Sequence, residues 1–176
     1  MSKENNIPDE ELIKLVGNGD LKAMEELFNR YYEQLCNFAF KFLKDRDASK
    51  DIVSDIFSKI WQKKNSLIIS SNLRAYLYIS VRNRAINFLQ TNKKLYTIEQ
   101  NKEAKNVIEK DDFTMAIENE EEVEKILSKL PEKKKLVFRL KVIDGLKYKE
   151  IAEILSISVN TVQNHIVQAY KILSEK

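Results

Sequence analysis

Turn-forming residues are almost absent from the middle of this chain. Between Asp20 and Asp144 there is no glycine and a single proline, Pro131. A sheet protein of this length needs many more such residues to connect its strands. With 43% hydrophobic and 32% charged residues, the composition suits amphipathic helices around modest cores. The sequence therefore predicts an all-α protein.

Capping residues and apolar periodicity predict where the helices lie. In the N-terminal half we expect helices over 9–16, 21–43, 46–64 and 72–93, with Asp20 as the N-cap of the second. The fourth is apolar over so much of its circumference that no buried face can be assigned. In the C-terminal half we expect helices over 121–130, 131–143, 148–155 and 159–173. Pro131 fits the first position of its helix, and Gly145 fits the residue that follows its end.

The charges divide the chain into three parts. Residues 1–95 carry 16 basic and 12 acidic groups, residues 96–122 carry 3 and 9, and residues 123–176 carry 11 and 6. The polar, acidic middle has weak periodicity, which is typical of a linker. We therefore expect two small helical domains, 1–95 and 123–176, joined by an acidic linker over 96–122. The two basic ends favour a polyanionic partner.

Few residues are available for catalysis or metal binding. Cys36 is the only cysteine and His165 the only histidine, so we expect no disulfide, zinc site or Cys–His nucleophile. Asp47, Asp51 and Asp55 share a helix face, but without further ligands a solvated or protein-binding face is the simpler interpretation. We expect no enzyme activity, no cofactor and no small-molecule substrate. The lack of a long apolar run or signal peptide predicts a soluble, cytoplasmic protein.

The last predicted helix has two contrasting faces. Its apolar residues recur at spacings of three and four, within a sector of about 80°; they are Val159, Val162, Ile166, Ala169 and Leu173. The other side carries amide, hydroxyl and basic groups, and no acid lies between Glu153 and Glu175. Its residues are Asn160, Thr161, Asn164, Gln168 and Lys171, with Gln163 and His165 on the flanks and Ser158 as the N-cap.

The last two predicted helices have the pattern of a helix-turn-helix. The first presents a matching apolar face of Tyr148, Ile151, Ala152 and Leu155, and residues 156–158 form the hinge. The second helix of such a motif enters the DNA major groove, where Asn and Gln can bond adenine and Lys can reach guanine or phosphate. The alternative is a plain helical hairpin, but its polar face would ordinarily mix Glu with Lys. The sequence favours DNA binding.

A long stretch of the N-terminal half contains no acidic residue. From Ile56 to Ile98 there are eight basic residues interleaved with aromatic ones. Cations neutralise phosphates and aromatic rings stack on exposed bases, so this composition favours single-stranded nucleic acid. Phe57 and Trp61 match the inward period of their helix and are better explained as core. For Tyr76, Tyr78 and Phe88 the sequence does not decide between core and stacking.

These segments together resemble a known family. The segment "FNRYYEQLCNFAFKFLKDRDASKDIVSDIFSKIW", followed by "NLRAYLYISVRNRAINFL", is similar to the second conserved region of bacterial sigma factors. The segment "LPEKKKLVFRLKVIDGLKYKEIAEILSISVNTVQNHIVQAYKIL" is similar to their fourth region. With only these two regions, the chain resembles the extracytoplasmic-function (ECF) subfamily. Each motif alone is moderately specific, whereas both in this order are strongly specific.

The resemblance implies roles for particular residues. The segment that docks on core RNA polymerase corresponds to Asp51, Asp55, Phe57, Ile60 and Trp61, of which the two aspartates are the better candidates for contact. The part that opens and recognises the −10 element as single-stranded DNA corresponds to Lys63, Lys64, Arg74, Tyr76, Arg82, Asn83, Arg84 and Asn87. The −35 element would be recognised as duplex by Ser158, Asn160, Thr161, Gln163, Asn164, His165, Gln168 and Lys171.

The resemblance also implies partners, and it leaves an alternative. Expected partners are core RNA polymerase, promoter DNA and an anti-sigma factor, with the acidic linker threading the basic channel of the polymerase. The family usually has Asp and Arg where this chain has Asn87 and Gln90, and Trp in place of Tyr76, so the resemblance carries over the role of this helix but not a promoter sequence. The alternative is a stand-alone LuxR-type regulator, which "IAEILSISVNTVQNHI" also resembles. Such a regulator needs a receiver or ligand-binding domain, and residues 1–95 lack the alternating strand and helix pattern to form one.

Overall fold

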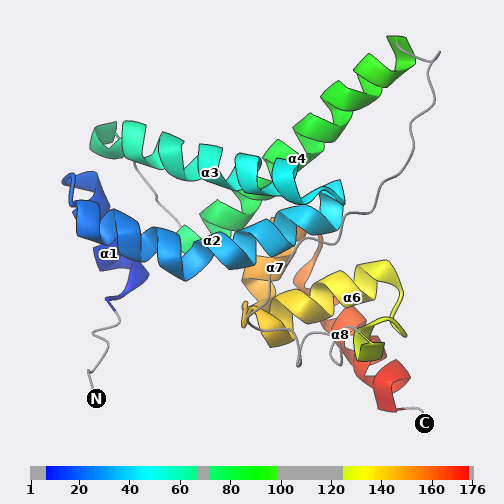
Figure 1. Ribbon diagram of the computed structural model, residues 1–176. Coiled ribbons are helices and arrows are strands. Elements are labelled where there is room, and N and C mark those ends of the chain that lie inside the picture. Colours follow the sequence, from blue (N-terminus) through cyan, green and yellow to red (C-terminus); the bar gives the residue numbers. More distant parts are fainter. Residues whose placement is uncertain (1–6, 67–71, 99–124, 175–176) are drawn as a thin grey trace. The chain divides into compact units, whose positions relative to one another are not determined.

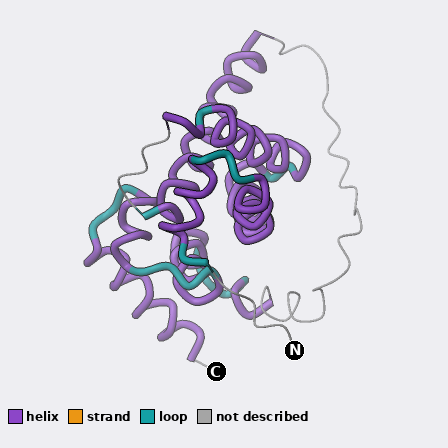
Figure 2. The backbone as a smooth tube through the Cα atoms, turned by 90° about the vertical axis from the view of Figure 1, so that its left-hand side faces the viewer, coloured by secondary structure: helices purple, strands orange, loops and turns teal. Residues whose placement is uncertain are grey.

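The chain folds into two helical units, Met1–Ile98 and Glu99–Lys176. The computed structural model describes residues 7–66, 72–98 and 125–174, with side chains through Thr91 in the second range. Every regular element in these ranges is helical, and no strand occurs among them (Figure 2). The predicted all-α fold with two small helical domains is therefore confirmed. Residues 99–122 of the predicted linker lie outside the described residues.

The N-terminal unit is built mainly from helices (Figure 1). Its elements are α1 (Asp9–Gly17), α2 (Leu21–Leu43), α3 (Arg46–Gln62), the 3-10 helix η1 (Lys64–Ser66) and α4 (Leu73–Ile98). Asp20 caps α2, because its Oδ1 accepts the backbone N–H groups of Lys22 at 2.8 Å and Ala23 at 3.1 Å. Both this cap and the predicted start of α2 are confirmed.

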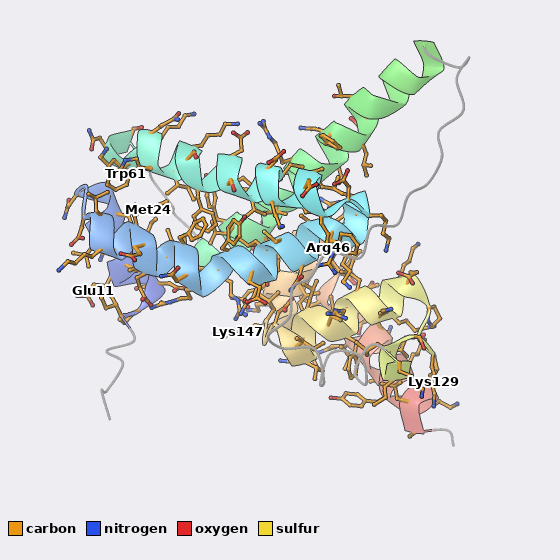
Figure 3. The ribbon with its side chains drawn as sticks, in the orientation of Figure 1. Glu11, Met24, Arg46, Trp61, Lys129 and Lys147 are labelled. Atoms are coloured by element: carbon orange, nitrogen blue, oxygen red, sulfur yellow. The ribbon has the colours of Figure 1, made fainter. Side chains whose placement is uncertain are left out.

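The core of this unit forms around α2, which packs against α1, α3 and α4. The apolar residues predicted to recur along α2 are buried at Leu27, Tyr31, Leu35 and Phe38, whereas Phe42 is half-buried. The inward residues of α3 are buried as well, apart from the half-buried Trp61 at its end (Figure 3). Since these side chains follow the helical period, the sequence alone was enough to place them.

Helix α4 is the element that the sequence described least well. It extends to Ile98 instead of Lys93, so residues 96–98 of the predicted linker are helical. Its buried side chains are Leu73, Ala75, Leu77, Tyr78, Val81 and Ala85. No residue from Ile86 to Thr91 is buried, and the helix runs on past α3 (Figure 1). The bundle therefore buries side chains of the first half of α4, whereas the described residues that follow, Ile86 to Thr91, stay partly or fully exposed.

Helix α1 is tied to α2 by a polar cluster. The Arg30 Nη1 donates to the backbone oxygen of Ile7 and to Asp9 Oδ1, both at 2.8 Å, and the Tyr31 hydroxyl donates to Asp9 Oδ2. Burial raises the pKa of Tyr31, and its hydrogen bond to Asp9 raises that pKa further. The cluster fixes the start of α1 against the middle of α2.

The C-terminal unit contains a helix-turn-helix. Its elements are a helical turn at residues 125–127, α6 (Glu132–Phe138), the π-helix η2 (Arg139–Ile143), α7 (Tyr148–Leu155) and α8 (Val159–Ser174). Pro131 was predicted at the first position of its helix, but it is the N-cap of α6, which begins one residue later at Glu132. Gly145 follows the end of η2 with a φ of +66°, as predicted for a residue that must be left-handed. The π-helical end of this segment was not predicted.

Candidate nucleic-acid interfaces

The face that α8 presents to solvent is set by its cap and its buried stripe. The Ser158 Oγ accepts the backbone N–H of Thr161 at 3.0 Å and lies 2.8 Å from the Thr161 hydroxyl, which confirms the predicted cap. Val162, Ile166 and Ala169 are buried against α6 and α7. The opposite side of α8 must therefore face outward.

Most of the residues predicted to contact the −35 element are on this outward face. The exposed ones are Ser158, Asn160, Gln163, Asn164, Gln168 and Lys171, while Thr161 and His165 are half-buried. The helix carries no carboxylate, so none of its side chains would repel phosphate. The structure brings these residues together as one polar surface with a single cation, at Lys171.

Four apolar residues in or near this surface were either placed differently by the sequence or not considered. Val159 was expected inside, but it is 36% exposed because the helix begins there and the stripe of α8 is covered only from Val162 onward. Ile154 of α7 is fully buried and was not predicted, whereas Leu155, placed in the predicted face, is half-buried. Val167 is 68% exposed in the middle of the polar face. The sequence held one sign of this exposure: Val167 is spaced by three residues from Asn164 and by four from Lys171, so the three share one helix face.

The second surface lies on α4 of the N-terminal unit. Of the residues predicted to contact the −10 element, Asn83, Arg84 and Asn87 are exposed. Those that are half-buried are Arg74, Tyr76 and Arg82. The three aromatic residues that the sequence left undecided now separate: Tyr78 is fully buried, Tyr76 is half-buried and Phe88 is 37% exposed. Tyr78 is thus a core residue, and stacking on bases is open only to the other two.

Arg84 pairs with one of the residues predicted to bind the polymerase. Its Nη2 donates to Asp55 Oδ2, joining α4 to α3, and Lys59 Nζ lies 3.4 Å from the same oxygen. Desolvation acts to raise the pKa of Asp55, but the cations of Lys59 and Arg84 outweigh it, so this pKa lies below its usual value. The carboxylate therefore stays ionised through the neutral range. The two predicted sites meet at this ion pair.

Lys64 is held by its own unit. Its Nζ lies 4.3 Å from the centroid of the Trp61 ring, a cation–π contact. The stem of the side chain passes the turn after α1, where a Cβ added at Gly19 would lie 3.5 Å from Lys64 Cε. Lys63 remains exposed. The structure thus gives Lys64 a role in anchoring the chain after α3. Residues 67–71, which follow η1, lie outside the described residues.

The residues predicted to bind the polymerase do not all reach the surface. Phe57 and Ile60 are each only 2% exposed, so their prediction as contact residues is wrong: both face the core of their unit. The Phe57 ring lies 5.1 Å from that of Phe28 and 6.5 Å from that of Tyr32. Of the five predicted contact residues, those that remain accessible are Asp51, Asp55 and Trp61.

Other kinds of site find little support in the described part of the chain. No three His, Cys, Asp or Glu side chains in 7–66, 72–91 and 125–174 lie close enough together to hold a metal ion. None of the described helices is long and apolar enough to cross a membrane. The polar surfaces of α4 and α8 are therefore the candidate functional sites.

Comparison with known proteins accounts for both surfaces. A family model described as Sigma-70 region 2 matches residues 27–95, and one described as Sigma-70, region 4 matches residues 120–173. The ECF RNA polymerase sigma-E factor of Escherichia coli is 25% identical over 181 residues, which cover 97% of this chain and 94% of that protein. The chain belongs to the ECF sigma factors. The sigma-E factor of Haemophilus influenzae is 26% identical to this sigma factor, over 97% of this chain and 95% of that protein.

Solved structures share the fold of this sigma factor. The sigma factor RpoE of Bartonella quintana, solved with the anti-sigma factor NepR, matches with a TM-score of 0.63 and 21% identity, over 88% of this chain and 96% of that one. CnrH, solved with the cytosolic domain of CnrY, matches with a TM-score of 0.60 and 24% identity, over 94% of each chain. These likenesses support the all-α, two-unit fold.

The alternative of a stand-alone LuxR-type regulator is not favoured. That hypothesis explains only the helix-turn-helix of the C-terminal unit. It leaves the match of residues 27–95 to sigma region 2 without an explanation. As an ECF sigma factor, the protein directs transcription initiation.

Proposed function

We propose that this sigma factor binds core RNA polymerase through the exposed acidic face of α3 and recognises promoters with two separate surfaces. Helix α4 and the residues before it would contact the −10 element, and α8 would contact the −35 element. The observation that carries this division is that α4 and α8 each present polar side chains without a single carboxylate. Polar faces free of acids suit the phosphate-lined grooves and strands of DNA.

The two surfaces suit different forms of DNA. The α8 face is a helix side with amides near its N-terminal end, the part of a helix-turn-helix that lies nearest the base edges in the major groove. On α4, Asn83 and Asn87 lie one turn apart on the exposed side, and Phe88 offers a ring for stacking. Opening the −10 element costs a few kcal/mol for each unstacked base, which contacts of this kind would offset.

This sigma factor would also have protein partners, and it would act in the cytoplasm. The acidic segment over 99–122, with its charge opposite to that of residues 1–98 and 123–176, would follow a basic channel of the polymerase. An anti-sigma factor is a further expected partner, since a sigma factor of the same fold has been solved with one. The sigma factor would have no catalytic step of its own. A protein that acts on core polymerase and promoters acts in the cytoplasm.

Transcription in a purified system tests the proposal. Core polymerase would be incubated with genomic DNA of the source organism, with and without this protein, and the 5′ ends of the transcripts would be sequenced. We expect the protein to create discrete start sites that share sequence elements about 10 and 35 base pairs upstream. Starts that stay scattered in its presence would contradict the proposal.

Truncation of the α8 amides should relax the choice of −35 sequence. We expect Asn164→Ala and Gln168→Ala each to lower discrimination by about tenfold at one base pair, because a bidentate amide–adenine contact accounts for about 1–3 kcal/mol. The measurement is competition between the best −35 element and its single-base variants for the holoenzyme. Gln34→Ala, which removes an exposed amide of α2, is the matched control. Unchanged discrimination in both α8 variants would contradict the assigned face.

A further inference from the structure

We propose that Val167 contacts the 5-methyl group of a thymine in the −35 element, beside adenines contacted by Asn160 and Asn164. The −35 element would then be rich in A·T base pairs. This inference rests on the proposed function of α8 and adds the identity of the bases that it recognises.

The exposure of Val167 requires an explanation. At 68% it is the most exposed large apolar side chain in the described part of the C-terminal unit, ahead of Tyr170 at 55%. A β-branched residue has a lower helix propensity than most, so neither burial nor helix formation favours valine at this position. Single exposed apolar residues are common on proteins, and the position of this one is therefore what gives it meaning.

Val167 lies in the centre of the DNA-facing side of α8. Asn160, Asn164, Val167 and Lys171 are spaced by four, three and four residues, so they fall within a sector of about 60°. The buried Val162 and Ala169 lie on the opposite side of the helix. If α8 lies in the major groove with this side toward the DNA, Val167 reaches a base edge between those contacted by Asn164 and by Lys171.

The chemistry of this row matches an A·T pair better than a G·C pair. In the major groove, thymine alone presents a methyl group, and adenine presents the acceptor and donor that an amide can bond together. Guanine is contacted most often by Arg or Lys, but α8 has no arginine and no lysine before Lys171. The face thus offers partners for adenine and thymine over its first three turns.

The test begins with selection of the element. The holoenzyme, assembled from the full chain and core RNA polymerase, would be presented with promoter duplexes randomised through the −35 region. Each thymine of the enriched sequence would then be replaced by deoxyuridine, which removes only the methyl group. We expect one replacement to weaken binding about fourfold, the effect of burying one methyl group.

Variants of Val167 assign that effect to a side chain. In Val167→Ala the same deoxyuridine replacement should have no effect, while Val167→Thr, which keeps a branched methyl, should retain the loss. Leu21→Ala, which truncates a 69% exposed apolar residue of the other unit, should behave as the unchanged protein.

The outcomes separate this inference from the proposed function. An enriched −35 element that is rich in G·C pairs, or a methyl effect that persists in Val167→Ala, would overturn the inference and leave the function of α8 intact. Deoxyuridine replacements without any effect would do the same. A holoenzyme that enriches no −35 element would overturn both.

Discussion

Replacing Phe57 with alanine is expected to destabilise the N-terminal unit by about 3–5 kcal/mol, the usual cost of deleting a buried aromatic ring. The side chain is 2% exposed and packs against Phe28 and Tyr32, so its loss leaves a cavity between α2 and α3. Trp61 is the only tryptophan of the chain and lies one turn away on α3. Its fluorescence during urea unfolding therefore reports on this unit alone.

A conservative variant separates core packing from polymerase contact at this position. Phe57→Leu fills most of the space and should lose less stability than Phe57→Ala while binding core polymerase normally. Gln62→Ala, at the exposed end of α3, is the control for general effects on the helix. If Phe57→Ala kept its unfolding midpoint and lost polymerase binding instead, the ring would belong to the contact surface after all.

Reversing the charge of Asp55 is the second large effect that we expect. Asp55→Arg should lower affinity for core polymerase by at least about tenfold, because an interface built for a carboxylate would then face a like charge. The fold should persist, since this pair lies at the surface, where ion pairs contribute little to stability. The measurement is equilibrium binding to core polymerase, with circular dichroism as the check on folding.

The ion pair with Arg84 makes a sharper version of this experiment possible. The double variant Asp55→Arg with Arg84→Asp restores a pair of opposite charges across α3 and α4. If the carboxylate contacts the polymerase, the double variant stays defective. Recovery of full affinity would mean that the ion pair between α3 and α4 is what matters and that the carboxylate of Asp55 does not contact the polymerase. Asp51→Arg changes an exposed residue one turn earlier, which makes no ion pair with any residue that the structure describes, and should weaken binding without this complication.

The sequence predicted those features of the fold that depend on neighbouring residues. Asp20 and Ser158 cap helices through hydrogen bonds that span three residues or fewer, and Gly145 supplies a local left-handed turn. Helix α4 was predicted poorly because its residues are apolar on most sides. Its buried face is chosen by the helices packed against it, which periodicity does not describe.

The candidate sites show the same limit. Helical spacing alone placed the polar face of α8 correctly, because one stripe of that helix is buried. The contact between Arg84 and Asp55 joins residues 29 apart, and no local pattern could reveal it. The resemblance placed Lys64 among the residues that contact the −10 element, but its contacts with Trp61 and with the turn at Gly19 depend on how η1 packs against α1. Val167 was not considered, because it belongs neither to the apolar stripe of α8 nor to its amide, hydroxyl and basic residues.

Competition for core RNA polymerase tests the central claim most directly. Purified protein would be titrated against a labelled housekeeping sigma factor bound to bacterial core polymerase, with the release of the label followed by fluorescence anisotropy. The proposed function predicts complete and mutually exclusive displacement. A protein that binds duplex DNA but never displaces the housekeeping factor would contradict it.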